Sequence, residues 1–162
     1  MTLPIAELST SLPTTDFTVF GGTGDLALRK LLPAVYHRER EGHLPEDTRI
    51  IGVSRSGLDD AGYRDLVRAA LDEHVPAEQV DAAVVERPVA RVFHVALDVE
   101  HGDDWHLLHG LLKESPGGPA TVRVFYLAVA PALFGPICER LDSIGVVDEH
   151  ARVVMEKPVG HD

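Results

Sequence analysis

The sequence contains a single cysteine, Cys138, and few basic residues, with 15 Lys and Arg against 26 Asp and Glu. One cysteine excludes an internal disulfide and a cysteine-rich zinc site, and it suits a reducing compartment. The formal net charge of −11 argues against binding to nucleic acid or to an anionic membrane, because both need clustered cations. A local basic site for a small phosphate ligand stays open.

Long apolar runs are absent as well, and residues 1–16 have neither the basic segment nor the apolar core of a signal peptide. We expect residues 1–16 to form a flexible leader and the chain to be soluble and cytoplasmic. At 162 residues the chain has the length of about one domain, predicted here over residues 17–162. Any function that needs a second domain is expected to be incomplete in this chain.

Five short apolar runs rich in Val, Ile and Phe alternate with amphipathic helical patterns. Because most of these runs are nearly continuous, they predict strands that are buried on both faces of a parallel sheet. The alternation favours an α/β fold with a doubly wound, mostly parallel sheet and helices on both faces. The predicted strands cover residues 17–21, 49–54, 91–97, 122–128 and 152–156, and the predicted helices cover 25–40, 59–73, 103–113 and 132–144.

A glycine cluster lies where the first predicted strand ends and the first predicted helix begins. Gly21, Gly24 and Ala27 form a G-x-x-G-x-x-A pattern. Residues without a Cβ allow a sharp turn and a close approach of the backbone to a pyrophosphate, which the helix N-terminus then attracts. An ordinary strand-to-helix turn is the alternative interpretation. A phosphate-transfer loop fits less well, because the G-x-x-x-x-G-K-[ST] spacing is absent.

The end of the second predicted strand indicates which dinucleotide the turn suits. Enzymes that use NAD usually have Asp or Glu there, where the carboxylate accepts hydrogen bonds from the ribose 2′-hydroxyl. This strand ends instead in Ser54, Arg55 and Ser56. A guanidinium and a serine hydroxyl favour a 2′-phosphate, so the predicted coenzyme is NADP. The alternative is that Arg55 is an ordinary solvated cation.

Three stretches together resemble the coenzyme domain of the glucose-6-phosphate dehydrogenase family. They are "GGTGDLALRKLLPAVY" at 21–36, "FYLAVAPALFGPICERL" at 125–141 and "VVMEKPVGHD" at 153–162. The resemblance implies a Rossmann-type domain that binds NADP, within an enzyme that oxidises glucose 6-phosphate to 6-phosphogluconolactone in the oxidative pentose phosphate pathway.

The resemblance also implies roles for individual residues. Arg55, with Ser54 beside it, corresponds to the family's contact with the 2′-phosphate, and Ala130 and Pro131 border the nicotinamide ribose. Lys30 and Lys157 correspond to lysines at the junction of coenzyme and sugar phosphate, and Pro158 to the proline of a cis Lys-Pro bond. The pyrophosphate turn corresponds to Gly21, Gly22, Thr23, Gly24, Asp25 and Leu26.

Catalytic residues are not found in this sequence. In the family, a histidine oriented by a carboxylate accepts the sugar hydroxyl proton, and its Arg-Ile-Asp-His-Tyr-Leu-Gly-Lys-Glu stretch does not occur here. His106 and His109 lie three residues apart without a third metal ligand, and His161 has no evident acidic partner. We therefore expect a truncated or excised coenzyme domain that binds NADP without catalysis, and that associates through apolar surface left uncovered.

Two further interpretations remain open at this stage. "FGGTG" at residues 20–24 also resembles the start of atypical short-chain dehydrogenases that sense NADP without catalysis. Active members of that group use a Tyr-x-x-x-Lys pair, and none of Tyr36, Tyr63 and Tyr126 is followed by lysine at that spacing. The last possibility is a degenerate domain that binds no coenzyme.

Overall fold

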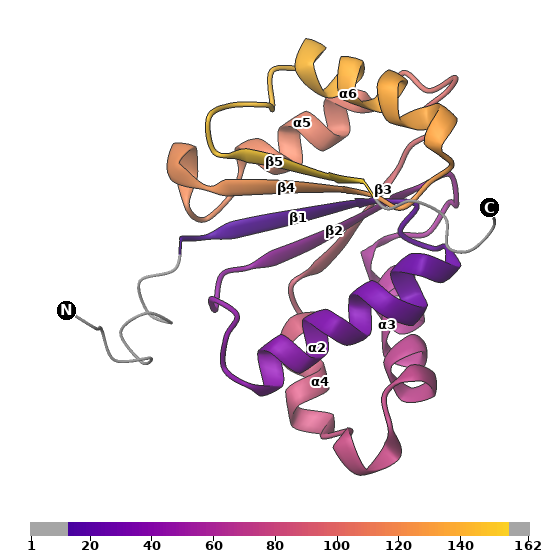
Figure 1. Cartoon of the computed structure of the whole chain (residues 1–162), viewed down its shortest axis with the longest axis vertical. Helices are drawn as coiled ribbons and strands as arrows, with labels where there is room; N and C mark the ends of the chain where they lie inside the picture. The colour runs from indigo at the N-terminus through magenta and orange to yellow at the C-terminus, as the bar shows by residue number, and fades with distance from the viewer. Residues whose placement is uncertain (1–12, 156–162) are drawn as a thin grey trace.

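A parallel sheet of five strands forms the centre of the computed structural model, which describes residues 13–155 (Figure 1). The strand order is β3-β2-β1-β4-β5, so the chain proceeds outward from β1 in one direction and then in the other. This order confirms the predicted doubly wound α/β fold. The strands are β1 (Thr15–Phe20), β2 (Arg49–Ser54), β3 (Val92–Ala96), β4 (Val122–Leu127) and β5 (Ala151–Met155).

Helices cover both faces of the sheet. In Figure 1, α2, α3 and α4 lie on one side of the strands, and α5 and α6 lie on the other. Right-handed connections place the helices on opposite faces when the strand order runs in opposite directions from β1. The helices are α2 (Leu32–Arg40), α3 (Asp60–His74), α4 (Ala82–Val89), α5 (Trp105–Lys113) and α6 (Phe134–Ser143), and the short helical turns are η1 (Ala27–Leu31), η2 (Ala77–Gln79), η3 (Gly118–Ala120) and η4 (Pro131–Leu133).

Two apolar clusters form the core, one on each face of the sheet. Phe20 and Phe125 pack with Trp105 on the side of α5 and α6, whereas Val19 and Ile50 pack with the α2–α4 layer on the other side. Adjacent residues of one strand therefore enter different clusters. This explains why the strand runs are nearly continuous in the sequence rather than alternating.

A buried ion pair joins β1 and β2 near their amino-terminal ends. Arg49 Nε donates to Asp16 Oδ1 at 2.9 Å and Arg49 Nη2 donates to Asp16 Oδ2 at 2.7 Å, and these two residues are register partners. Asp16 is fully buried, and Arg49 also donates to the Leu111 carbonyl. β1 begins at Thr15, whereas the apolar pattern predicted a start at residue 17. The pattern missed the first residues of the strand because the charged Asp16 is buried by its ion pair and not by apolar character.

The helix predicted over residues 25–40 is continuous but contains a π-helical turn, η1. The N–H of Leu32 donates to the Ala27 carbonyl, five residues back. Pro33 follows directly, and a proline lacks the N–H of an α-helical bond and clashes with the carbonyl four residues before it. The wider turn accommodates this proline, and α2 then continues to Arg40.

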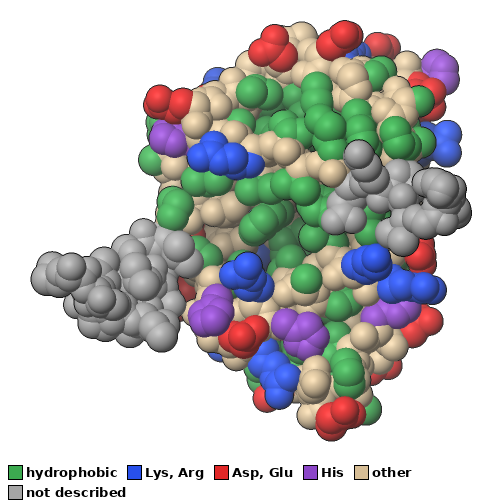
Figure 2. Space-filling model, in the orientation of Figure 1, with side chains coloured by type: hydrophobic (Ala, Val, Ile, Leu, Met, Phe, Trp, Pro, Cys, Tyr) green, Lys and Arg blue, Asp and Glu red, His purple; other side chains and the backbone are tan. Residues whose placement is uncertain are grey.

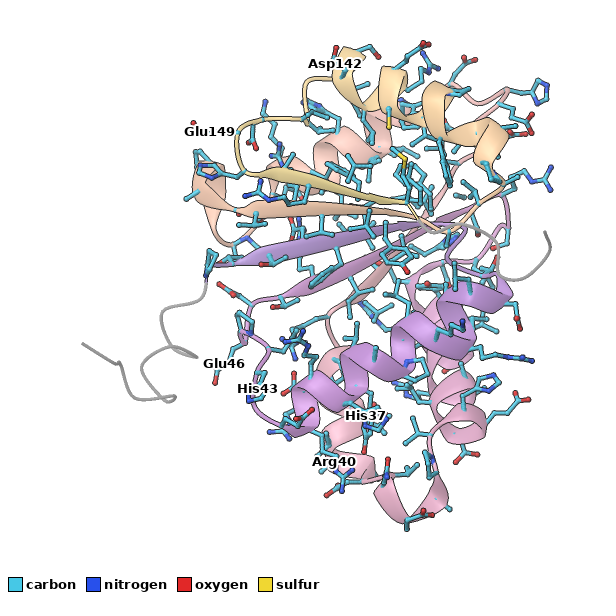
Figure 3. The ribbon with its side chains drawn as sticks, in the orientation of Figure 1. His37, Arg40, His43, Glu46, Asp142 and Glu149 are labelled. Atoms are coloured by element: carbon cyan, nitrogen blue, oxygen red, sulfur yellow. The ribbon has the colours of Figure 1, made fainter. Side chains whose placement is uncertain are left out.

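Charged side chains gather around the far end of α2, away from the glycine turn. Figure 3 shows His37 and Arg40 in the last turn of the helix, with His43 and Glu46 in the loop that follows. Cations near a helix C-terminus interact favourably with its dipole. Arg40 therefore stabilises the end of α2, which lies away from the glycine turn.

The sequence patterns did not indicate α4. Its Asp81 N-cap accepts hydrogen bonds from the N–H groups of Ala83 and Val84, which starts the helix. Pro88 lies inside the helix, where proline normally indicates an end. Because α4 spans only eight residues, Pro88 lies near its last turn and the cost is small.

The face of β4 and β5 on the α2 side carries no helix among residues 13–155. Figure 2 shows hydrophobic side chains gathered in a hollowed band on this face. An apolar groove of about 430 Å³ lies next to this area, between β1 and α2, with Phe17, Val35 and Val122 in its lining. In β5, Val153, Val154 and Met155 are 38%, 37% and 49% exposed. The strand order explains this bare area, because both outward connections beyond β1 place their helices on the opposite face.

Candidate coenzyme cleft

An open cleft of about 450 Å³ lies at the carboxyl ends of the central strands. The strand order reverses at β1, and ligands of doubly wound sheets bind at such a switch point. The cleft includes residues that follow β1, β2, β3 and β4. Its lining consists of Gly21, Thr23, Gly24, Ser54, Arg55, Ser56, Leu97, Asp98, Val99, Glu100, Val129, Ala130 and Leu133.

The glycine turn forms one wall of this cleft. Gly21 has a φ of 82°, and a Cβ there would lie 2.2 Å from the carbonyl oxygen of Ala128. The N–H groups of Gly21 and Gly22 both donate to the Val53 carbonyl, at 2.9 and 3.1 Å. The N–H of Gly24 then donates to the Gly21 carbonyl at 2.9 Å. The turn is thus tied to β2 and too close to β4 for any side chain at Gly21.

Tyr63, on α3, supports the turn through a hydrogen bond. Its Oη donates to the Gly22 carbonyl at 2.8 Å, and the side chain is fully buried. A Cβ at Gly52 would lie 2.3 Å from Tyr63 Cζ, so the ring packs directly on the backbone of β2. Burial raises the pKa of the Tyr63 phenol, which keeps its hydroxyl protonated as a donor. The sequence pattern placed Tyr63 only on the apolar face of a helix and gave no sign of this contact.

The geometry of the turn fits a dinucleotide pyrophosphate. The first helix begins directly after Gly24, whose carbonyl accepts from the N–H of Leu28 at 3.1 Å. The first N–H groups of a helix have no acceptor within the helix and attract an anion. Thr23 and Gly24 line the cleft at this point. A cradle without room for a Cβ, next to a helix N-terminus, is what close approach of a pyrophosphate requires.

The end of β2 forms a second part of the cleft lining. Arg55 is exposed, and Ser54 and Ser56 are partly buried beside it, with their Oγ atoms 3.1 Å apart. Next to it, after β3, the Asp98 carboxylate accepts hydrogen bonds from the N–H groups of Glu100 and His101, which lower its pKa. The cleft therefore has a cation and two hydroxyls at β2 and carboxylates after β3.

The structure brings most of the predicted coenzyme residues together. Gly22 is buried within the turn and is not part of the cleft lining, Asp25 is exposed and pairs with Arg29 at 3.4 Å, and Leu26 lies in the first helical turn. Pro131 begins η4 directly after Ala130. The six predicted residues that share the cleft lining are Gly21, Thr23, Gly24, Ser54, Arg55 and Ala130.

The two predicted lysines do not join this group. Lys30 is exposed on η1 and is not part of the cleft lining. Lys157, together with Pro158 and His161, lies outside the described residues. The role of either lysine at a sugar phosphate therefore stays a prediction.

Several residues of the cleft lining were not predicted from the sequence. They follow β3 and β4, which were predicted as apolar runs at residues 91–97 and 122–128. The ends of these two runs could therefore have indicated where the lining residues lie. His94 was missed as well, because it lies inside β3, and only the pairing of Gly52 with His94 places it beside β2. The missed lining residues are Leu97, Asp98, Val99, Glu100, Val129 and Leu133.

The remaining histidines show no metal site. His106 Nδ1 lies 3.2 Å from the Asp103 carbonyl, and His109 is partly buried on α5. Within residues 13–155, no group of three or more His, Cys, Asp or Glu side chains is placed to hold a metal ion. In the same residues, no helix has the length and apolar character needed to span a membrane.

Comparison with known proteins connects this cleft to one family. The family model described as "Glucose-6-phosphate dehydrogenase, NAD binding domain" matches residues 18–162. The chain belongs to this family. The finding confirms the resemblance seen in the three motifs, and nothing in the comparisons supports the short-chain dehydrogenase alternative. The family description makes a nicotinamide dinucleotide the cofactor class.

Curated relatives and solved structures agree with this assignment. Glucose-6-phosphate 1-dehydrogenase of Mycolicibacterium smegmatis is 53% identical over 91% of this chain and 30% of its own length. The Rhizobium meliloti enzyme is 45% identical over 91% of this chain and 29% of its own length. The crystal structure of the Mycobacterium avium enzyme is 35% identical with a TM-score of 0.75, covering 94% of this chain and 31% of that one.

A second solved structure, glucose-6-phosphate dehydrogenase in complex with its substrate glucose 6-phosphate, is 32% identical with a TM-score of 0.78. It matches 93% of this chain and 31% of that one. The chain therefore spans about a third of the length of the relatives that it matches.

Proposed function

We propose that the cleft binds NADP, with the 2′-phosphate at the end of β2. The supporting observation is the position of Arg55, Ser54 and Ser56, which line the same cleft as the glycine turn. A guanidinium binds a phosphate through paired, charge-assisted hydrogen bonds, and the strand end has no carboxylate to repel it. The other residues follow from this placement: Gly21 to Leu26 would hold the pyrophosphate, and Ala130 and Pro131 would border the nicotinamide ribose.

We further propose that this domain serves the oxidation of glucose 6-phosphate to 6-phosphogluconolactone. The support is its membership of the family and the similar structure that holds glucose 6-phosphate. The coenzyme, when bound, supplies the hydride acceptor, and this chain holds it in place. Lys30 and Lys157 are proposed to contact the sugar phosphate. Because the family's catalytic histidine stretch is not among these 162 residues, the chain alone is proposed to bind coenzyme without turnover. A cytoplasmic location stays a prediction.

Thermal unfolding with and without coenzyme tests the NADP proposal. NADP at about 100 times its dissociation constant is expected to stabilise the chain by about 2.7 kcal/mol, which raises Tm by about 5–10 °C. NAD at the same concentration is expected to give less than about half of that shift, since it lacks the group that Arg55 binds. Equal shifts with both coenzymes would contradict the assignment of the 2′-phosphate, and no shift with either would support a domain that binds nothing.

We propose that the chain, studied alone, self-associates through β5. Among the described residues β5 pairs only with β4, and an open edge with exposed apolar side chains favours pairing with another chain. Val154→Lys is expected to weaken association by about tenfold in sedimentation velocity, because burying an ammonium is unfavourable. Val147→Lys, at a residue 42% exposed in the preceding loop, is the control. A wild-type chain that remains monomeric at high concentration would refute this.

A further inference from the structure

His94 lies directly behind the serine pair of the proposed 2′-phosphate site. Its Nε2 is 2.8 Å from Ser54 Oγ, and its Nδ1 is 2.9 Å from the Leu58 carbonyl oxygen. Its backbone N–H donates to Asp60 Oδ1 at 2.7 Å, which anchors β3 to the start of α3. The imidazole is thus held from both sides, and it is only partly buried.

These contacts determine which atoms carry hydrogens. A carbonyl oxygen only accepts, so Nδ1 must carry the hydrogen that it shares with Leu58. In a neutral imidazole, Nε2 is then the acceptor, and the Ser54 hydroxyl must donate to it. The single hydroxyl hydrogen of Ser54 therefore points inward, toward His94.

The same reasoning extends to Ser56. The Oγ atoms of Ser54 and Ser56 lie 3.1 Å apart, and the N–H of Ser56 also donates to Ser54 Oγ at 3.3 Å. Because the hydrogen of Ser54 is engaged by His94, the Ser56 hydroxyl must donate to Ser54. With neutral His94, both hydroxyl hydrogens therefore point away from the cleft, and Ser56 Oγ presents only lone pairs to it, which repel a phosphate.

A proton on His94 reverses this chain of hydrogen bonds. Once Nε2 carries a hydrogen, it donates to Ser54 Oγ. The Ser54 hydroxyl then either turns toward the cleft or donates to Ser56 Oγ, and in the second case the Ser56 hydrogen no longer bonds to Ser54. In either case one hydroxyl hydrogen becomes available to the cleft, where a phosphate oxygen can accept it. One proton enters from solvent and no covalent bond other than N–H is formed.

We propose that His94 is a positioning residue for 2′-phosphate recognition, acting through Ser54 and Ser56, and that NADP binding is coupled to proton uptake at His94. This inference rests on the proposed placement of the 2′-phosphate. It makes the preference for NADP over NAD depend on pH, because NAD lacks the group that benefits from the released hydroxyl hydrogen.

The surroundings of His94 keep it neutral before the phosphate arrives. Burial lowers the pKa of His94, while the Leu58 carbonyl and the Asp60 carboxylate act in the opposite direction. Of the other groups on α3, Tyr63 packs its ring 5.1 Å from the imidazole, and Arg64 donates to the Val92 carbonyl on β3. On the cleft side the charged groups are Arg55, Asp98 and Glu100. A bound phosphate dianion adds negative charge that favours the imidazolium.

Affinity measurements across pH test the coupling. The complex binds more protons than the free chain, so NADP affinity is expected to rise as pH falls from 8 to 5.5. Relative to His94→Gln, the wild-type affinity is expected to gain about tenfold, as for one added hydrogen bond to a charged group. The phosphate's own titration near pH 6 opposes this but is common to both proteins, so the ratio removes it. NAD affinity is expected to show no such difference.

Calorimetric measurement of proton uptake provides a second test. NADP binding by the wild type near pH 7, measured in buffers of different ionisation enthalpy, is expected to take up a fraction of a proton more than NADP binding by His94→Gln, because the phosphate's own proton release is common to both. NAD binding is expected to show no such difference. Ser54→Ala is expected to abolish that uptake because it breaks the chain of hydrogen bonds. His106→Gln, an exposed histidine on α5, is the control and is expected to match the wild type.

The outcomes separate this inference from the function on which it rests. Parallel pH profiles for wild type and His94→Gln, with NADP still preferred over NAD, would overturn the role of His94 alone. Absence of any NADP preference at every pH would overturn the 2′-phosphate site itself.

Discussion

Gly21→Ala is expected to abolish coenzyme binding and to lower the free energy of unfolding by about 2–5 kcal/mol, the largest effect that we predict. The backbone at Gly21 has a φ of 82°, which is unfavourable for alanine, and the new Cβ would lie 2.2 Å from the Ala128 carbonyl oxygen. To relieve the contact, the turn must move away from β4 and thereby lose its hydrogen bonds to Val53. Denaturant unfolding and NADP titration measure the two effects.

Gly42→Ala is a matched control for this substitution. Gly42 also has a positive φ, of 74°, but a Cβ there would meet nothing within 4 Å. Only the backbone cost of about 1–2 kcal/mol is expected, with unchanged NADP binding. If both variants lost the same stability and bound NADP equally well, close approach at the glycine turn would not matter for the site.

Arg55→Ala is expected to weaken NADP binding by about 10- to 100-fold and to leave NAD binding nearly unchanged. Arg55 is exposed at the end of β2 and lines the cleft, so its removal eliminates charge-assisted hydrogen bonds to a 2′-phosphate without disturbing the core. Fluorescence or calorimetric titration with the two coenzymes measures the ratio directly.

The control for Arg55 is Arg68→Ala, which removes another exposed arginine. Arg68 lies on α3 and pairs with Glu86 and Asp65, outside the cleft lining. Its loss is expected to leave both coenzyme affinities unchanged, because surface ion pairs contribute little. An equal loss of NADP and NAD affinity in Arg55→Ala would mean that this residue contacts a part common to both coenzymes.

Local patterns predicted much of the fold. β2 lies at residues 49–54 as expected, and Asp59 caps α3, where its carboxylate accepts from the N–H of Gly62. Periodicity and capping are properties of neighbouring residues, so they are visible in a linear sequence. The errors in the predicted elements also have local causes. Pro88 argued against a helix at α4, and the charge of the buried Asp16 argued against a strand at the start of β1.

The fold class, the family and the glycine turn were all predictable from the sequence, because these depend on residues that are close together along the chain. Which distant side chains meet around that turn depends instead on how the chain folds in three dimensions. Tyr63 supports the carbonyl of Gly22 from 41 positions away, and His94 reaches Ser54 from 40 positions away. Such contacts depend on strand order and register, which place β3 beside β2, and on the packing of Tyr63 of α3 against Gly52 of β2, and no short pattern encodes that arrangement.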